Sequence, residues 1–239
     1  MNVIEIKDLK KIYRETEVEV KAVNGINLTV AQGEFTAIVG PSGSGKTTLL
    51  NLIGGLDTPT EGDVVVDGTA LSQLSSSQLI DFRLRNIGFV FQSYNLIPVL
   101  TAEENVEFIM HLQGVDKTKR RERAKNLLTS VGLGDRINSR PSKLSGGQQQ
   151  RVAVARALAS HPKFVLADEP TANLDSKSTA TLLDIMLKLN KEEGVTFVFS
   201  THDQRVVQKA RRVITVEDGK VVSDVITKNG RKEMADSPQ

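Results

Sequence analysis

The stretch "EFTAIVGPSGSGKT", Glu34 to Thr47, decides the fold of this chain. Its first half has the short apolar run of a buried strand, and its second half places glycines and hydroxyl residues around one lysine. A strand that opens into a glycine-rich loop and then a helix is typical of a phosphate-binding loop, because backbone N–H groups and the positive helix end converge on phosphate oxygens. The residues expected to surround the phosphates are Gly40, Pro41, Ser42, Gly43, Ser44, Gly45, Lys46, Thr47 and Thr48.

A second strand, "FVLADE", ends in two acids that complement this loop. Ligands bind at the carboxyl ends of parallel strands, so we expect Asp168 and Glu169 beside the phosphates. Lys46 is expected to reach the β- and γ-phosphates, and Thr47 and Asp168 to contribute to a Mg²⁺ shell. Glu169 suits polarising the water that attacks the γ-phosphate. An acidic pair after a strand more often forms a solvated turn. Here the phosphate loop elsewhere in the same chain makes a catalytic role for the pair the favoured interpretation.

The rest of the chain alternates short apolar strands with helices, which favours an α/β fold. Further strands are expected in "EGDVVVDG", in "IGFVFQ" (Ile87 to Gln92) and in "VTFVFSTH". The pair Asp218-Gly219 between two apolar runs predicts a hairpin. Residues 101–161 contain no good strand pattern, only helical stretches, the first with a capping box at Thr101 and Glu104.

Composition excludes several classes of protein. The 31 Lys and Arg residues against 29 Asp and Glu residues leave a formal charge of +2, too balanced to indicate an electrostatic nucleic-acid binder. The chain has no cysteine, which excludes disulfides and thiolate metal sites. The first residues lack the apolar core of a signal peptide, and no apolar run is long enough for a membrane span. We therefore expect a cytoplasmic protein that reaches a membrane only through a partner.

The stretch "LSGGQQQR", Leu144 to Arg151, has paired glycines at the start of a helix although no strand precedes it. Ser145 and Gln148 form a capping box, which explains two of the four residues after Leu144. Gly146 and Gly147 each cost roughly 1 kcal/mol of helix propensity relative to alanine, and capping gives no reason for them. A bare helix N-terminus headed by a hydroxyl is an anion site, so we expect it to bind the γ-phosphate of a nucleotide held by another copy of the chain.

Together, "GPSGSGKT", "LSGGQ" and "FVLADE" resemble, in this order and spacing, the nucleotide-binding subunit of an ATP-binding cassette (ABC) transporter, with a match from about Ile4 to Val225. The resemblance implies a P-loop NTPase (RecA-like) α/β core with an N-terminal antiparallel β subdomain and an inserted α-helical subdomain. The expected domains are 1–92 with 162–227 for the core and β subdomain, 93–161 for the helical subdomain, and 228–239 for a flexible polar tail. It also implies a head-to-tail homodimer around two ATP molecules with Mg²⁺.

Four more positions match the family. Tyr13 stands where the family stacks an aromatic ring on adenine, and Gln92 where a glutamine contacts Mg²⁺ and the attacking water. Asp175 caps a helix beginning at Ser176 and, by resemblance, contacts the other subunit. His202 matches the histidine that contacts the γ-phosphate. No catalytic position departs from the family pattern, so we expect an active ATPase.

Two stretches, "IGFVFQSYNLIPVLTAEENVEF" and "IGGLDTPTEGDVVVDG", resemble the branch whose permeases drive lipoprotein release, macrolide efflux or antimicrobial-peptide resistance. By that resemblance, the chain lies on the cytoplasmic face of the bacterial inner membrane, and residues 93–106 receive a short helix of the permease. The apolar side chains offered for docking are Tyr94, Leu96, Ile97 and Leu100; packing onto the core explains them nearly as well.

Of the other classes of protein with these motifs, only a regulatory cassette fits the sequence equally well. A chromosome-maintenance or repair ATPase would need a coiled-coil insertion or zinc-binding cysteines, and translation-associated relatives carry two cassettes in one chain. A regulatory cassette that signals through a membrane partner to cell-wall hydrolases would have the same catalytic residues. The basic run "KTKRRERAK", residues 117–125, is far more typical of a solvated helix face than of a site for RNA or anionic lipid.

Overall fold

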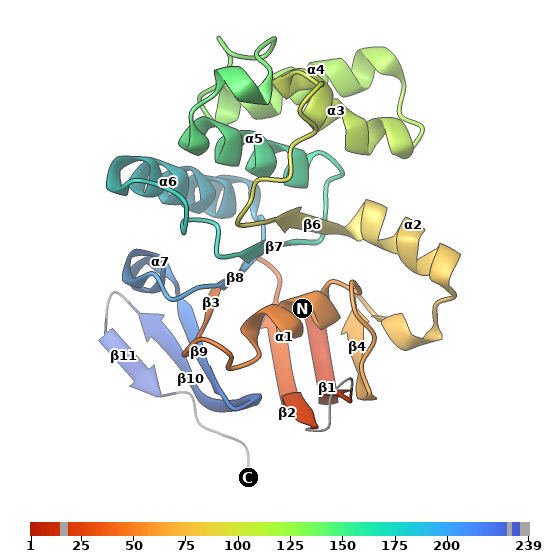
Figure 1. Cartoon of the computed structure of the whole chain (residues 1–239), viewed down its shortest axis with the longest axis vertical. Coiled ribbons are helices and arrows are strands. Elements are labelled where there is room, and N and C mark those ends of the chain that lie inside the picture. Colours follow the sequence, from red (N-terminus) through yellow and green to blue (C-terminus); the bar gives the residue numbers. More distant parts are fainter. Residues whose placement is uncertain (15–18, 229–230, 235–239) are drawn as a thin grey trace.

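The computed structural model describes residues 1–14, 19–228 and 231–234, which form two sheets with helices packed against them (Figure 1). The larger sheet of the described chain has the strand order β11-β10-β9-β3-β8-β7-β6. Its strands pair in parallel from β9 to β6, whereas β9, β10 and β11 pair antiparallel. The bounds are β3 Phe35–Val39, β6 Ile87–Val90, β7 Phe164–Asp168, β8 Phe197–Ser200, β9 Arg212–Glu217, β10 Lys220–Lys228 and β11 Arg231–Met234.

The smaller sheet is antiparallel and comes from the N-terminal part of the chain. Its order is β2-β1-β4-β5, with β1 Asn2–Tyr13, β2 Val20–Ala31, β4 Glu61–Val66 and β5 Thr69–Ala70. Its inner face packs, with α1 (Lys46–Ile53), against one side of the larger sheet around Ile4, Leu9 and Ile38. This packing places β2 against the loop that precedes α1.

The remaining helices are α2 Ser76–Asn86, α3 Ala102–Leu112, α4 Lys117–Ser130, α5 Gly146–Leu158, α6 Ser176–Glu193 and α7 Gln204–Lys209. Helices α3, α4 and α5 form a layer beyond the edge strand β6 (Figure 1), and the segment 93–161 contains no strand. Within the described part of the chain, no helix combines the length and the apolar character needed to cross a membrane.

A second core cluster joins α5 and α6 to the other side of the larger sheet. Three phenylalanines of the central strands anchor it, with the ring centroids of Phe35 and Phe199 4.6 Å apart and those of Phe35 and Phe197 5.8 Å apart. All three side chains are fully buried. Because this core fixes β3, β7 and β8 relative to one another, the loops at their carboxyl ends have a rigid base.

The elements confirm the predicted α/β architecture with an antiparallel sheet and inserted helices, and they correct three details. "EGDVVVDG" forms a strand as expected, β4, but it lies in the antiparallel sheet, and only Val64 and Val66 of this strand are buried. Helix α2 was not predicted, although the capping box of Ser75 and Gln78 marks its start; none of its residues is fully buried, and Leu79 and Phe82 pack against the core as partly buried side chains. The expected flexible tail, residues 228–239, is in part a strand, because Lys228 is the last residue of β10 and β11 pairs with β10. Residues 229–230 and 235–239 of this tail lie outside the described residues.

Asn105 of α3 holds the chain segment that follows β6. Its fully buried side-chain carbonyl accepts from the amide of Ile97 at 2.8 Å. Its amide donates to the carbonyls of Ile97 at 3.2 Å, Leu100 at 3.1 Å and Thr101 at 2.9 Å. One side chain therefore satisfies four backbone groups, and it connects the loop after β6 to the helical layer.

We expect Asn105→Ala to lower the free energy of unfolding by about 2–4 kcal/mol, because buried backbone groups lose their partners. Urea denaturation, monitored by circular dichroism, measures this free energy of unfolding. Asn27→Ala is the matched control, because the side chain of Asn27 is exposed and donates to Asp8. We expect the free energy of unfolding of this variant to change by less than about 1 kcal/mol. Equal losses in the two variants would contradict the role assigned to Asn105.

Candidate functional site

The phosphate loop, residues 40–47, leaves β3 and enters α1 with a backbone that requires glycine at two positions. Gly40 has φ 154°, and a Cβ there would lie 2.0 Å from the carbonyl oxygen of Val216. Gly45 has φ 99°, and its Cβ would lie 2.0 Å from the carbonyl oxygen of Ala22. Strand β9 and the antiparallel sheet therefore press against the loop from two sides, and only bare backbone fits between them.

Lys46 begins α1 and is almost fully buried. Its ammonium group donates to the carbonyls of Gly40 at 2.9 Å and Pro41 at 2.8 Å. The side chain thus folds back over the loop, which holds its charge at the helix N-terminus. A cation at this position adds to the field of the loop's N–H groups and favours a phosphate ligand.

A cleft of about 990 Å³ surrounds the loop and gathers most of the predicted site. We call it the phosphate-loop cleft. All residues from Gly40 to Thr48 line it, together with Gln92, Glu169 and His202. Sequence reasoning missed the wall supplied by β2 and the β9–β10 hairpin, where Gly219 donates its amide to the carbonyl of Ser44 at 3.1 Å. The missed residues are Val20, Lys21, Ala22, Asn24, Ala172, Asp218 and Gly219.

Thr47 and Asp168 meet although they lie far apart in the sequence. The Thr47 hydroxyl donates to the Asp168 carboxylate at 3.2 Å, because α1 starts next to the end of β7. The two supply hard oxygen ligands beside the phosphate loop, the kind that Mg²⁺ prefers. Among the described residues, no group of three or more His, Cys, Asp or Glu side chains could hold a metal ion. A Mg²⁺ ion at this place would take its other ligands from phosphate and water, as is usual for this ion.

Glu169 follows Asp168 and has an unusual backbone, with φ 45°. Its side chain is largely buried, and one carboxylate oxygen lies 2.8 Å from Nδ1 of His202. The other oxygen is buried and has no hydrogen-bond partner among the described residues. A buried carboxylate oxygen without a partner is costly, so this arrangement favours a site that accepts a hydrogen bond from a bound molecule. The His202 side chain is mostly exposed and faces the same cleft.

The segment 144–148, which we call the signature segment, lies at the start of α5. Ser145 accepts from the amide of Gln148 while the Gln148 side chain accepts from the amide of Ser145, which confirms the predicted capping box. A separate cavity of about 150 Å³, the signature cavity, opens here, and it shares no lining residue with the phosphate-loop cleft. Its lining is Ser145, Gly147, Gln148, Arg151, Lys177, Ser178 and Thr181.

The two signature glycines also have an internal role that sequence reasoning did not find. A Cβ on Gly146 would lie 2.7 Å from the Tyr94 hydroxyl, and one on Gly147 would lie 2.7 Å from the Ser178 hydroxyl. Bare backbone at these two positions therefore also allows close packing against Tyr94 and Ser178 of the same chain.

Four predicted site residues line neither cavity: Asp168 and Gly146, whose contacts are given above, and Asp175 and Tyr13. Asp175 caps α6 by accepting from the amides of Lys177 and Ser178, both at 2.9 Å, as predicted. Tyr13 ends β1 and donates to Asp57 at 2.8 Å; burial, and then this hydrogen bond, raises the pKa of its phenol. Stacking of Tyr13 on adenine and contact of Asp175 with another subunit stay predictions.

An apolar groove of about 480 Å³ lies between α2, β6 and α3. We call it the docking groove. Ile80 and Leu112 are 59% and 55% exposed there, which is high for large apolar side chains. Of the four apolar residues expected to dock a partner, only Ile97 lines the groove. The other apolar lining residues are Leu56, Leu84, Ile87, Phe89, Phe91, Phe108, Ile109 and Ala157.

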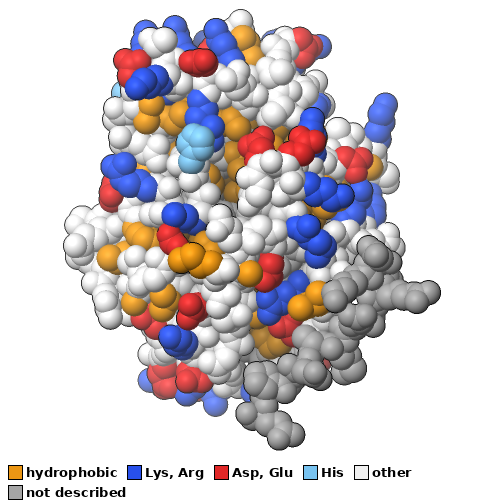
Figure 2. All heavy atoms as spheres, turned by 180° about the vertical axis from the view of Figure 1, so that it is seen from behind, with side chains coloured by type: hydrophobic (Ala, Val, Ile, Leu, Met, Phe, Trp, Pro, Cys, Tyr) orange, Lys and Arg blue, Asp and Glu red, His pale blue; other side chains and the backbone are white. Residues whose placement is uncertain are grey.

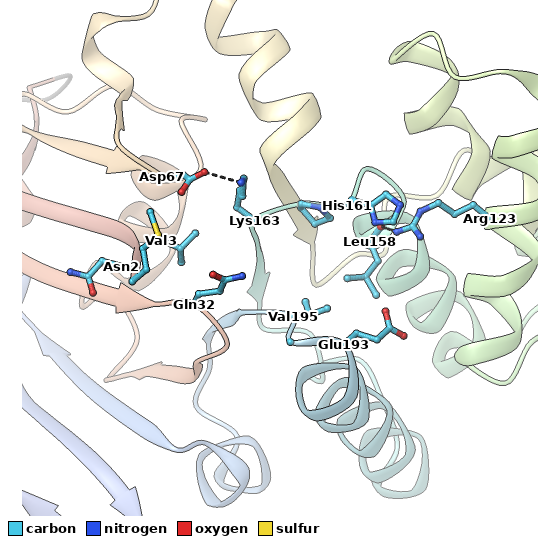
Figure 3. A pocket seen from close by; sticks show the side chains of 13 residues that line it. Asn2, Val3, Gln32, Asp67, Arg123, Leu158, His161, Lys163, Glu193 and Val195 are labelled. Atoms are coloured by element: carbon cyan, nitrogen blue, oxygen red, sulfur yellow. Dashed lines mark hydrogen bonds and ion pairs between the residues drawn. The ribbon is translucent and has the colours of Figure 1, made fainter.

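Figure 3 shows a further cavity, of about 340 Å³, lined by none of the predicted site residues. Three of its charged side chains have internal partners: Lys163 pairs with Asp67 at 2.8 Å, and Arg123 donates to the carbonyls of Leu158 and Ala159 at the end of α5. This cavity is therefore a polar junction between the sheets and the helical layer. Figure 2 shows that basic and acidic side chains are interspersed over the face seen there, as the balanced composition predicts.

Comparisons with known proteins identify the family of this chain. A model of the ABC transporter family matches residues 23–172. A protein of Thermotoga maritima, described as an uncharacterized ABC transporter ATP-binding protein, is 51% identical over 92% of this chain and 93% of its own length. The macrolide export ATP-binding/permease protein MacB of Hyphomonas neptunium is 47% identical over 97% of this chain and 36% of its own length.

Solved structures give the same result. The ATP-binding cassette MJ0796, in a dimeric post-hydrolysis state with bound ADP and Pi, matches with a TM-score of 0.87 at 43% identity, over 95% of this chain and 99% of that one. The family model spans more than half of the chain, and the relatives cover nearly all of it. The chain therefore belongs to the ABC transporter family, as an ATP-binding cassette whose ATPase activity is coupled to transport.

Proposed function

We propose that two copies of this chain close head to tail around two ATP molecules and thereby drive a permease of the lipoprotein-release, macrolide or peptide export type. The observation that carries the dimer is the separation of the two anion sites: the phosphate-loop cleft and the signature cavity have no lining residue in common. The bare helix N-terminus at Ser145 then binds the γ-phosphate of an ATP held by the other copy. The dimeric state of the MJ0796 cassette supports this arrangement.

Within each nucleotide site, the residues of this chain have distinct roles in hydrolysis. Lys46 and the loop amides bind the phosphates, and Thr47, Asp168 and Gln92 would hold Mg²⁺, which would neutralise charge on the phosphate oxygens. One carboxylate oxygen of Glu169 lies within hydrogen-bond distance of His202, and the other, which has no partner among the described residues, accepts a hydrogen bond from the attacking water. The buried carboxylate orients that water and accepts its proton, while exposed His202 contacts the γ-phosphate.

The docking groove is the proposed seat for a short cytoplasmic helix of the permease. Its lining is mostly apolar, with Arg83, Asn95, Arg156 and Ser160 as its polar members. Two of its large apolar side chains are more than half exposed, which is typical of a protein interaction site. The MacB relatives are described as ATP-binding/permease proteins, and this chain covers about a third of their length. This supports a permease partner of that branch, and with it a place on the cytoplasmic face of the cell membrane.

The fraction of the chain that sediments with membranes is expected to depend on the permease. Cells with and without the permease gene are fractionated, and the chain is quantified by immunoblotting. We expect nearly all of it to leave the membrane fraction when the permease is absent. Persistent membrane binding would instead indicate direct lipid contact, for which the basic run 117–125 is the first region to test.

Ile80→Glu and Leu112→Glu are expected to lower the membrane-bound fraction by about tenfold or more, because docking would bury an unpaired carboxylate. Basal ATP hydrolysis of the purified variants should stay unchanged, because the groove lies outside the phosphate-loop cleft. Val222→Glu is the matched control, since Val222 of β10 is 54% exposed and lies outside the groove. Wild-type sedimentation of the groove variants would exclude this groove as the permease site.

A further inference from the structure

Gln150 of α5 joins two segments of the hydrolytic site. Its side chain is fully buried, and its amide nitrogen donates to the carbonyl of Phe91 at 3.2 Å and to that of Pro170 at 2.8 Å. Phe91 directly precedes Gln92, and Pro170 directly follows Glu169. One side chain from the helix that starts at the signature segment therefore holds both loops that carry predicted hydrolytic residues.

The Pro170 carbonyl needs this partner because the sheet ends before it, whereas the Phe91 carbonyl also accepts from the amide of Tyr94 at 3.4 Å. The parallel pairing of β6 and β7 ends with Val90 opposite Ala167, so the ladder supplies no donor for the residues beyond. An enclosed carbonyl without a donor costs free energy, and a carboxamide has two N–H donors in a fixed geometry. The Gln150 amide therefore sets how the two segments lie relative to each other.

The backbone of Glu169 makes this support important. A non-glycine residue at φ 45° is strained and persists only when its surroundings hold it. On one side, the amide of Glu169 donates to the carbonyl of Ser200 at 2.8 Å. On the other side, Gln150 holds the carbonyl of Pro170. These two hydrogen bonds fix the direction in which the Glu169 carboxylate points.

We propose that Gln150 is a positioning residue that couples the signature segment to Glu169 and Gln92 of the same chain. Ser145 and Gln150 lie at the start of one helix, so a displacement of the first moves the second. The inference rests on the proposed head-to-tail function, in which Ser145 binds ATP held by the partner subunit. Gln150 then transmits the occupancy of one nucleotide site to the hydrolytic residues of the other.

Gln150→Met tests the proposal, because it removes both donors and keeps the length of the side chain. We expect kcat to fall about tenfold or more, since a small displacement of a catalytic group has a large effect on rate. ATP-driven dimerisation, measured in a Glu169→Gln background, should change by less than about twofold, because Gln150 contacts neither phosphate site. Gln113→Met is the control: it removes a similar bond, from Gln113 to the carbonyl of Leu84 at 3.0 Å, and should leave kcat unchanged.

Gln150→Glu provides a second measurement that does not depend on the methionine variant folding. The introduced carboxyl group can donate one hydrogen bond while it is protonated, whereas its ionised form donates none and repels both carbonyls. The ratio of the kcat of this variant to that of the wild type should therefore fall as pH rises through the raised pKa of a buried carboxyl.

Three results would overturn the role of Gln150: a kcat of Gln150→Met within about twofold of the wild type, an equal loss of dimerisation and turnover, or a pH-independent ratio for Gln150→Glu. Failure of the Glu169→Gln protein itself to dimerise with ATP would count against the head-to-tail function instead. The kcat and pH measurements would still decide whether Gln150 positions Glu169.

Discussion

Glu169→Gln is expected to lower ATP turnover by about a hundredfold or more while binding of MgATP persists, the usual scale for a positioned general base. The physical reason is local: one Glu169 oxygen contacts His202 and the other is buried without a partner among the described residues. A carboxamide has nearly the same shape, so the cleft stays intact, but it cannot accept a proton. Steady-state phosphate release measures turnover, and size-exclusion chromatography with ATP should show an accumulated dimer.

The control for this experiment is Glu61→Gln. Glu61 lies on β4, where it forms an exposed ion pair with Lys10 at 2.6 Å, and it is absent from the phosphate-loop cleft. Its loss should leave turnover unchanged, because exposed ion pairs contribute little. Near-normal turnover in Glu169→Gln would remove Glu169 from the role of the base.

Mixed dimers of two inactive variants are expected to regain one nucleotide site. Lys46→Ala damages the phosphate loop, and Ser145→Arg places a bulky cation where a γ-phosphate binds. If each site combines the loop of one copy with the signature segment of the other, one site of the mixed dimer collects both lesions and the other is intact. If the signature segment served its own chain's nucleotide, every site would remain damaged.

ATP trapping in a Glu169→Gln background is the measurement, because hydrolysis itself can require both sites to close together. The two variants carry different affinity tags, so that mixed dimers are isolated by sequential purification. We expect about one trapped ATP per mixed dimer, half of what an intact head-to-tail dimer holds. Trapping no higher than in either parent variant would exclude the head-to-tail arrangement.

Much of the site follows from local sequence. The glycines at 40 and 45 and the lysine at 46 form the predicted loop, and the capping residues Ser145 and Asp175 act as expected. These features depend on backbone conformation and on neighbours within a few residues, so the sequence is sufficient to predict them. The apolar strands that end at Val39 and Asp168 likewise place the loop and the acids at one edge of the sheet.

Other features could not be predicted because they depend on contacts between distant segments. Helix α2 has no fully buried residue, and only its position beside β6 and α3 makes it one wall of the docking groove. Strand β11 is defined by backbone pairing with β10, which leaves little signal in side-chain pattern. The packing of Gly147 against Ser178 appears only once α5 and α6 lie side by side.

Local sequence is sufficient for the motifs of this protein: a phosphate loop, an acidic strand end and a capped helix N-terminus with two glycines. The tertiary structure decided how these parts are connected. Gln150 reaches Phe91, which is 59 residues away, and Pro170, which is 20 residues away. The physical reason is that motif chemistry depends on adjacent residues, whereas the partners of a buried amide are chosen by the packing of α5 against β6 and β7.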